Sequence, residues 1–321
     1  MKVVHWTLKN GSGLHRVAES MAKAEQALGL ESLTIDTMVS SGWDKGVDAD
    51  IHCVHSHLPD IVDRKKAKIV HFIHGTPEHS FQNSVEQGLS GNYAPSDSWM
   101  ITQYWLQHAD ITVTFWPRHQ AIWQSLCDKH NKIRLLPMGI DKSFWKPTES
   151  RGKFAGEPSL FTAENCHYIK WPLDLLMAWE WITNEIPKAR LHAHYIPKDQ
   201  HRWWFPLANR NGAAFKSFLS GGIFNDVDLR NCFTSVDYYI GLVRYGDFNR
   251  ICLEAKATGT KLISYKSNPY ADFWVEEGDQ REIAKQVVSI LRGDVSPRET
   301  QEVVDITETV RGTIKLYEEL S

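Results

Sequence analysis

The sequence predicts an α/β protein made of two doubly wound, Rossmann-like domains that face each other across a cleft. Short β-rich runs alternate with helical segments along both halves of the chain, which is typical of βαβ units that form a parallel sheet. A polar segment rich in Gly and Pro, residues 142–158, interrupts this alternation and is typical of an inter-domain linker. With 321 residues, the chain is long enough for two domains that each have a core.

The first half opens with a β-rich run at 2–8 and a glycine turn. A helix is expected next, because apolar residues recur on one face until Gly29 ends the pattern. The residues of that face are Leu14, Val17, Ala18, Met21 and Leu28. Further strands are predicted at 32–36, 51–57, 67–75, 109–115 and 132–141.

The second half repeats the alternation. Strands are predicted at 159–165, 189–196, 237–243 and 261–265, and helices at 171–187, at 226–236 and after a turn at 246–249. A last helix is expected from the helical spacing of Val303, Ile306, Val310, Ile314 and Tyr317. We therefore predict domains over 1–147 and 148–300, and a C-terminal helix over 301–321 that crosses back to the first domain. Ligands of doubly wound folds bind beyond the carboxyl ends of the strands, which places the expected site in the cleft.

Composition narrows the class of protein. The chain is 42% apolar and 23% charged, and it has no apolar run of the roughly 18 residues that a membrane span needs. The N-terminus lacks the apolar stretch of a signal peptide. Five scattered cysteines, none in a CxxC pair, argue against a disulfide framework and a zinc ribbon. We expect a cytoplasmic protein.

Charge and histidine content narrow the ligand class. The net charge of −3 is spread without a basic half, which argues against bulk nucleic-acid binding. Most of the 15 histidines precede residue 148, among them His55, His57 and His71, but their spacing does not match a usual zinc pattern. The "DVD" at 226–228 resembles the DxD of metal-dependent transferases, yet it lies at a helix start, where Asp is an ordinary cap. We expect no metal.

Residues 243–265, "VRYGDFNRICLEAKATGTKLISY", combine a turn, a short helix and a buried strand. Glu254 is a carboxylate among apolar neighbours near the start of that helix. Such a carboxylate can accept hydrogen bonds from two vicinal hydroxyls, as on a ribose. The helix N-terminus beside it suits a diphosphate, because it carries partial positive charge and free N–H groups.

The order of these signals resembles glycosyltransferase family 4 along nearly the whole chain. The family's motif has the form E-x-F-G-x4-E, followed by A-x-A-x-G and a buried strand, and here Phe248, Glu254, Ala255, Ala257 and Gly259 match it. The resemblance implies a GT-B fold and retaining transfer of a sugar from a nucleoside diphosphate to a hydroxyl. It favours a UDP-sugar over a GDP-sugar and implies no cofactor other than this co-substrate.

On the donor side, the resemblance implies that Glu254 binds the ribose and that the backbone at Asn249, Arg250 and Ile251 holds the diphosphate. Lys170 in "IKWP" matches the family's phosphate-binding lysine, which would stabilise the leaving diphosphate. The N-terminal glycine turn with Gly13 would let the backbone approach the donor.

The chain also departs from the family. Gly246 stands where the family has its first Glu, and Glu164 stands where it has an arginine. Asp247 could replace the missing carboxylate or be an ordinary turn former. Arg244 and Arg250 could replace the missing positive charge.

On the acceptor side, His74 at the end of a predicted strand matches a family position that hydrogen-bonds the donor sugar. It could instead simply cap the strand. Residues 78–108, polar with interspersed aromatics, are expected to be a loop that recognises the acceptor. We take Gly11, His79 and Trp99 as candidate acceptor-binding residues.

The acceptor stays open at this stage: a glycan, a lipid and a small molecule are all compatible with the sequence. The compact length and the loss of the first Glu are similar to phage enzymes that glucosylate hydroxymethylated bases in DNA, and basic clusters at 64–68 and 129–134 could contact phosphates. A second alternative is a catalytically inactive subunit that binds a nucleotide sugar. A dehydrogenase is disfavoured, because "GSGLHR" lacks the GxGxxG pattern.

Overall fold

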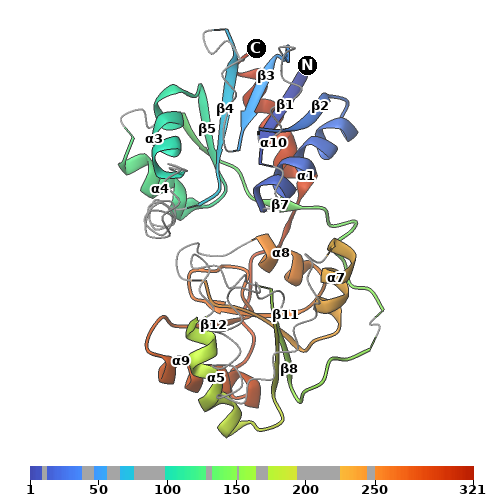
Figure 1. Ribbon diagram of the computed structural model, residues 1–321, viewed down its shortest axis with the longest axis vertical. Coiled ribbons are helices and arrows are strands. Elements are labelled where there is room, and N and C mark those ends of the chain that lie inside the picture. The colour runs from blue at the N-terminus through green and yellow to red at the C-terminus, as the bar shows by residue number, and fades with distance from the viewer. Residues whose placement is uncertain are drawn as a thin grey trace. The chain divides into compact units, whose positions relative to one another are not determined.

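The computed structural model describes two compact units of the chain (Figure 1). Unit 1 comprises Met1–Asp141 with Val304–Ser321, and unit 2 comprises Lys142–Val303. The described residues are 1–8, 13–37, 47–55, 66–75, 98–127, 132–149, 152–163, 173–193, 225–243 and 250–321. Each unit is an α/β domain with a parallel sheet and is described by itself.

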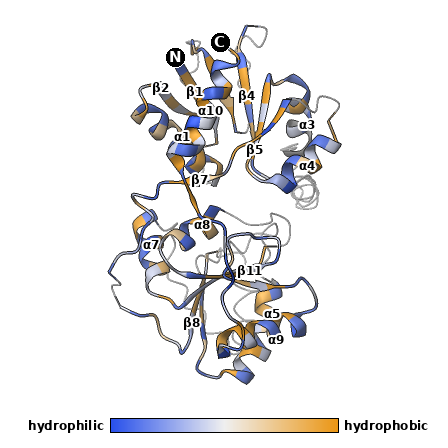
Figure 2. Ribbon diagram, turned by 180° about the vertical axis from the view of Figure 1, so that it is seen from behind, coloured by the Kyte–Doolittle hydropathy of each residue, from blue (hydrophilic) through white to orange (hydrophobic). Residues whose placement is uncertain are grey.

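Unit 1 contains a six-stranded parallel sheet in the order β2-β1-β3-β4-β5-β6. Its strands are β1 Lys2–Thr7, β2 Glu31–Asp36, β3 Ile51–Val54, β4 Lys68–Ile73, β5 Ile111–Thr114 and β6 Ile133–Leu135. Its helices are α1 Gly13–Ala27, α3 Ser98–His108, α4 Pro117–Ser125 and α10 Ile306–Glu318. Hydrophobic residues run along the central strands, as Figure 2 shows, because the sheet is covered on both faces.

Alternation along the strands sorts the buried side chains of unit 1 onto two faces. On one face, Trp6 packs with Trp105 of α3 in one apolar cluster. On the other face, His5 contacts Glu25 of α1, and Cys53 contacts Tyr317 of α10. Successive strand residues point to opposite sides of a sheet. His55 directly follows β3 and is two residues after Cys53, so it lies on this second face as well.

The C-terminal segment returns to unit 1, as predicted. A short strand, β13 (Val304–Asp305), pairs with β7 (Gly139–Ile140), and α10 then packs beside α1. The helix begins at Ile306 and not at residue 301, because the Asp305 side chain caps it by accepting a hydrogen bond from the Thr307 N–H. Val303 is buried but lies before the strand, so its helical spacing with the later residues is coincidental.

Unit 2 contains a five-stranded parallel sheet in the order β12-β11-β10-β8-β9. Its strands are β8 Ser159–Thr162, β9 Arg190–Ala193, β10 Tyr238–Gly241, β11 Lys261–Tyr265 and β12 Phe273–Val275. Its helices are α5 Leu173–Glu185, α7 Asp226–Thr234, α8 Arg250–Ala257 and α9 Gln280–Arg292. In both units the first strand along the chain lies between the second and the third, and the later strands follow beyond the third. The strand order therefore reverses at the first and third strands, and the two sheets share this topology.

Most predicted elements are present, with three differences. The prediction missed α4, β12, α9 and β13, although Asp279 caps α9 and Gly293 ends it with φ +82°. Residues 98–108 form α3, where the sequence predicted part of a loop. Leu28 is exposed and does not share the buried face of α1.

The Gly- and Pro-rich segment after residue 141 packs onto unit 2. Trp145 is buried against Phe233, and the backbone carbonyl of Phe144 accepts a hydrogen bond from Arg230. For this reason the observed division lies between Asp141 and Lys142, six residues before the predicted boundary at 147/148. No helix in the described part of the chain is long and apolar enough to span a bilayer.

Candidate functional site

The strand order of unit 2 reverses between β8 and β10, which are hydrogen-bonded neighbours. Ligands of doubly wound sheets bind beyond the carboxyl ends of the strands at such a reversal. Along the chain, β8 is followed by the segment that contains Lys170, and β10 is followed by the segment that leads to α8 and Glu254. Lys170 itself lies outside the described residues, as do Arg244, Asp247 and Asn249.

Glu254 lies in the second turn of α8 and is fully buried. Its Oε1 is 3.0 Å from Nε of Arg250, one helical turn earlier. The Arg250 side chain is only 12% exposed, so both charges of this pair are largely removed from water. A ribose bound by Glu254 would therefore share the carboxylate with Arg250 or displace it. Ile251 lies half-buried in the first turn of the same helix.

The far end of α8 is anchored to the rest of unit 2. Lys256 forms an ion pair with Asp272, whose other carboxylate oxygen accepts a hydrogen bond of 2.8 Å from the Leu262 N–H. Gly259 ends the helix with φ +85°, a conformation that favours glycine. Thr260 then donates a 2.7 Å hydrogen bond to the carbonyl of Phe233. This anchoring fixes the C-terminal end of α8 on unit 2.

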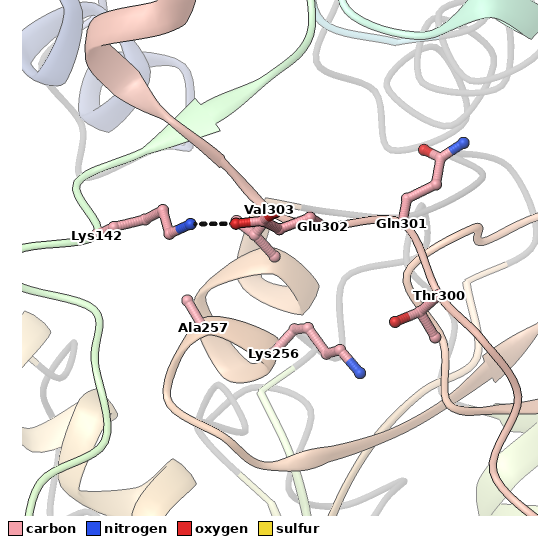
Figure 3. Close-up of a pocket in the computed structure, with 7 residues that line it drawn as sticks. All are labelled: Lys142, Lys256, Ala257, Thr300, Gln301, Glu302 and Val303. Atoms are coloured by element: carbon pink, nitrogen blue, oxygen red, sulfur yellow. Dashed lines mark hydrogen bonds and ion pairs between the residues drawn. The ribbon is translucent and has the colours of Figure 1, made fainter.

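A pocket of about 340 Å³ lies at this C-terminal end of α8 (Figure 3). Its lining includes Lys142 and Lys256, and the remaining lining residues are Ala257, Thr300, Gln301, Glu302 and Val303. Lys142 is 2.9 Å from Glu302, and Lys256 is held by Asp272. Both lysines of the described lining thus have a carboxylate partner.

In unit 1, His74 directly follows β4 and is half-buried. Its Nε2 is 2.9 Å from Nδ1 of His55, and Nε2 of His55 is 3.0 Å from Nδ1 of His5. The Nε2 of His5 is in turn 2.9 Å from Oε2 of Glu25. Three imidazoles from neighbouring parallel strands thus form one hydrogen-bonded chain that ends on a buried carboxylate.

Glu25 accepts two further hydrogen bonds. Ser32 donates to Oε2 over 2.6 Å, and the Tyr317 hydroxyl donates to Oε1 over 2.8 Å. Burial alone would raise the pKa of Glu25, but His5 and the hydrogen bonds from Ser32 and Tyr317 outweigh it and hold this pKa below its ordinary value. Glu25 is therefore an ionised carboxylate inside the protein.

Other predicted site residues are placed as follows. Gly13 is the exposed first residue of α1, and a Cβ at this position would meet nothing within 4 Å. Trp99 belongs to α3, but its side chain lies outside the described part of the structure, as do Gly11 and His79. The helix start at 226–228 is capped by Asn225, which accepts a hydrogen bond from the Asp228 N–H.

The imidazole chain does not resemble a metal site. Within the described ranges, no group of three or more His, Cys, Asp or Glu side chains could hold a metal ion. The reason is visible in the chain: the nitrogens of His5, His55 and His74 hydrogen-bond one another and do not converge on a common point.

Sequence reasoning missed Glu25, His5 and His55 as site residues. One signal was present: His5, His55 and His74 lie at or near the carboxyl ends of β1, β3 and β4, which are neighbours in the predicted kind of sheet. The connection to Glu25 could not be read, because it depends on how α1 and α10 pack against that sheet.

No family model and no curated protein matches the chain. Solved structures resemble it over its full length. Sucrose-phosphate synthase from Thermosynechococcus elongatus has a TM-score of 0.73 at 13% identity, covering 100% of this chain and 96% of that one. Anabaena HepE in complex with UDP-glucose has a TM-score of 0.66 at 11% identity, covering 100% and 98%. WaaG, a glycosyltransferase of lipopolysaccharide biosynthesis, has a TM-score of 0.63 at 14% identity, covering 99% and 98%. The chain therefore has the GT-B fold, with two Rossmann-like domains.

Proposed function

We propose that the chain is a retaining glycosyltransferase that moves a sugar from a UDP-sugar to an acceptor hydroxyl. The observation that carries this proposal is the reversal of strand order at β8 and β10, after which the chain supplies Lys170 and the Glu254-bearing helix α8. Solved proteins of the same fold include HepE with bound UDP-glucose. These features support a nucleotide-sugar site in unit 2.

In the proposed donor site, Glu254 accepts hydrogen bonds from the ribose hydroxyls, and the N-terminal turn of α8 with Asn249, Arg250 and Ile251 receives the diphosphate. Lys170 and Arg244 would add positive charge. The buried pair of Arg250 and Glu254 gives this site one acidic and one basic group on the same helical turn, which suits a ligand with hydroxyls beside phosphates. Gly13 would let the backbone of unit 1 approach the donor.

In the proposed reaction, the bond between the sugar's anomeric carbon and the diphosphate oxygen breaks, and a bond to the acceptor oxygen forms on the same face. The acceptor's proton passes to the leaving phosphate oxygen. The protein then acts mainly by positioning and by stabilising the developing negative charge. His74 and Asp247 would orient the donor sugar, and Gly11, His79 and Trp99 would contact the acceptor. No metal takes part in this proposal.

The proposal is tested by a thermal-shift screen of the whole chain with UDP, GDP and their sugars. A ligand at 100 times its Kd stabilises the folded state by about 2.7 kcal/mol, which is a readily measured shift. We expect UDP and one UDP-sugar to raise the Tm more than the guanosine compounds do. A chain that none of these compounds stabilises would contradict the proposed donor class.

Turnover is tested next by measuring release of UDP with and without an acceptor panel of glycans, lipids, small-molecule alcohols and DNA with hydroxymethylated bases. Acceptor-dependent release identifies the acceptor class. A protein that binds UDP-sugar but releases no UDP with any acceptor would instead be a nucleotide-sugar-binding subunit.

A further inference from the structure

One buried hydrogen bond in unit 2 links the two sides of the strand reversal. The hydroxyl of Tyr265, the last residue of β11, donates over 2.7 Å to Oδ2 of Asp174 in the first turn of α5. This helix follows β8 along the chain, and β10 lies between β8 and β11 in the sheet. The bond, which we name the α5 clamp, therefore ties the helix that begins on one side of the reversal to a strand on the other side.

The α5 clamp lies in an apolar core. Tyr265 and Asp174 are 1% and 2% exposed, and Tyr265 belongs to one core cluster with Leu175 and Trp179 of α5. Apolar side chains at both positions would fill such a core without the cost of burying polar groups. What the polar pair adds is a fixed distance between β11 and the start of α5, because each group needs the other at hydrogen-bond length.

Along the chain, the α5 clamp lies close to the proposed phosphate-binding lysine. Lys170 precedes Asp174 by four residues, so their Cα atoms are at most about 14 Å apart. The residues between them include Trp171 and Pro172. Proline fixes its own φ and restricts the residue before it, so the sequence of this link allows few conformations. A displaced start of α5 is therefore expected to displace Lys170 as well.

We propose that Tyr265 and Asp174 are positioning residues, which hold the start of α5 and thereby place Lys170 for the diphosphate of the donor. This assignment rests on the proposed function, in which Lys170 stabilises the leaving diphosphate. Neither clamp residue contacts the ligand in this assignment. Their hydrogen bond acts through the distance between the ammonium group and the phosphates, on which the stabilisation of charge depends.

A simpler interpretation gives Asp174 only the ordinary role of an acid in the first turn of a helix, where it stabilises the helix dipole. That role requires no partner on β11. It predicts that loss of the Tyr265 hydroxyl changes stability and has no connection to Lys170. The two interpretations therefore differ in whether the effects of Tyr265 and Lys170 on diphosphate binding are coupled.

The α5 clamp itself is tested by amide hydrogen exchange of the full chain without any ligand. Tyr265→Phe removes only the hydroxyl, so the ring stays in the core. The informative amides are those of residues 177–179, because in an α-helix they donate to the carbonyls of 173–175. We expect them to exchange about tenfold faster in this variant, while residues 183–185 at the far end of α5 change less. Unchanged exchange at 177–179 would overturn the proposal.

Two further variants serve as controls. Ser264, buried beside Tyr265 on β11, donates a hydrogen bond of the same 2.7 Å length to the carbonyl of Gly241 on β10. Ser264→Ala removes this bond and none to α5, so exchange at 177–179 should stay as in the wild type. Asp174→Asn keeps an oxygen that can accept from Tyr265 and should also keep the wild-type rates. If Ser264→Ala accelerates exchange at 177–179 as much as Tyr265→Phe does, the specific clamp is refuted.

The connection to Lys170 is tested by a double-mutant cycle in the Kd of UDP, measured by titration calorimetry. Lys170→Ala should weaken binding about tenfold, as for one charged hydrogen bond, and Tyr265→Phe roughly threefold, because a misplaced lysine keeps part of that interaction. The double variant should bind UDP as Lys170→Ala does, since the clamp has no lysine left to place.

The outcomes separate the positioning role from the proposed function. If the wild type binds UDP but the two losses multiply, or Tyr265→Phe binds UDP as the wild type does, the positioning role is wrong and the donor assignment stands. If the wild type does not bind UDP, the proposed function fails, and the role of Lys170 fails with it whatever the exchange rates are.

Discussion

Units 1 and 2 have the same strand topology but place different chemistry at the carboxyl ends of their strands. In unit 1 a hydrogen-bonded chain of imidazoles that ends on Glu25 lies near the reversal between β1 and β3. In unit 2 the corresponding reversal is between β8 and β10. The helix α8, which follows β10 along the chain, carries the ion pair of Arg250 with Glu254. One sheet topology thus presents a row of imidazoles in unit 1 and an ion pair in unit 2, and the proposed function assigns phosphates and hydroxyls to the second.

The difference follows from the side chains near the strand ends. The chain of imidazoles in unit 1 is mostly buried, and burial together with the neighbouring imidazoles lowers the pKa of His55 well below its ordinary value. The ion pair of unit 2 lies on the first helical turns, where the helix dipole adds positive charge at the N-terminus. The comparison predicts that substitutions in unit 2 change nucleotide binding, whereas substitutions in unit 1 change the pH dependence.

The largest effect is expected for Glu254→Ala. This change leaves the buried guanidinium of Arg250 without its carboxylate, which costs about 3–5 kcal/mol in comparable buried pairs. We expect a lower free energy of unfolding in urea and loss of UDP stabilisation.

The double variant Arg250→Met with Glu254→Leu separates these two effects. Replacing a buried pair by apolar residues restores much of the stability, so this protein should fold well and still fail to bind UDP. If the double variant binds UDP as the wild type does, Glu254 is a structural acid and the donor assignment in unit 2 is wrong.

The second expected effect is that the stability of unit 1 depends more strongly on pH than the stability of unit 2. Burial and the nearby His74 lower the pKa of His71 to about 3, and burial also lowers the pKa values of His52 and His55. Below the ordinary value near 6.5, the unfolded chain binds protons that the folded chain does not, so unfolding becomes easier as the pH falls from about 6.5 toward 3.

For His71 alone the expected slope is about 1.4 kcal/mol per pH unit in this window. Urea unfolding at pH 7, 6 and 5, monitored separately in the two units by hydrogen exchange, should show unit 1 losing stability faster. His71→Leu should reduce this slope by about 1.4 kcal/mol per pH unit, because one fewer proton is taken up on unfolding. An equal pH slope in both units would contradict the contrast drawn between them.

A third effect concerns how the C-terminal segment is held on unit 1. A Cβ on Gly139 would lie 2.5 Å from the Thr309 hydroxyl and 2.7 Å from the Asp305 carbonyl, so Gly139→Ala must push β13 and α10 away. Overpacking of this kind costs about 1–3 kcal/mol. We expect a lower Tm and faster amide exchange in α10.

The control is Gly13→Ala, where a Cβ meets nothing within 4 Å and stability should not fall. The same control tests the donor assignment, because a side chain at Gly13 should weaken UDP-sugar binding only if the backbone approaches the donor there. A destabilised Gly13→Ala would mean that this turn is tightly packed and not an open approach.

Sequence reasoning recovered the fold because it depends on local periodicity. Nearly every strand was readable from its apolar run, and helices such as α1 were readable from their spacing and their glycine stop. Local spacing also misled: Val303 fits the helical period of α10, but the Asp305 cap starts the helix after it.

The candidate site was less readable, for physical reasons. Glu254 was found because a local motif surrounds it, yet its pairing with Arg250 was not, since i,i+4 spacing alone does not show that the two side chains turn toward each other. The contact of Tyr317 with Glu25 joins residues 292 positions apart and depends on α10 returning to unit 1. Contacts of that kind come from packing and not from pattern.

The smallest effect is expected at the pocket of unit 2 beside α8. The ion pair of Lys142 and Glu302 is solvent-exposed, and pairs of this kind contribute about 0–1 kcal/mol. Lys142→Met should therefore change the Tm little and leave UDP stabilisation unchanged, because Lys142 lines a pocket at the C-terminal end of α8, whereas the proposed donor site is at the N-terminal end of this helix. Titrating UDP against this variant in a thermal-shift assay checks both points. A clear loss of UDP binding in Lys142→Met would move the donor site from the N-terminal end of α8 to its C-terminal end, and with it the role proposed for Glu254.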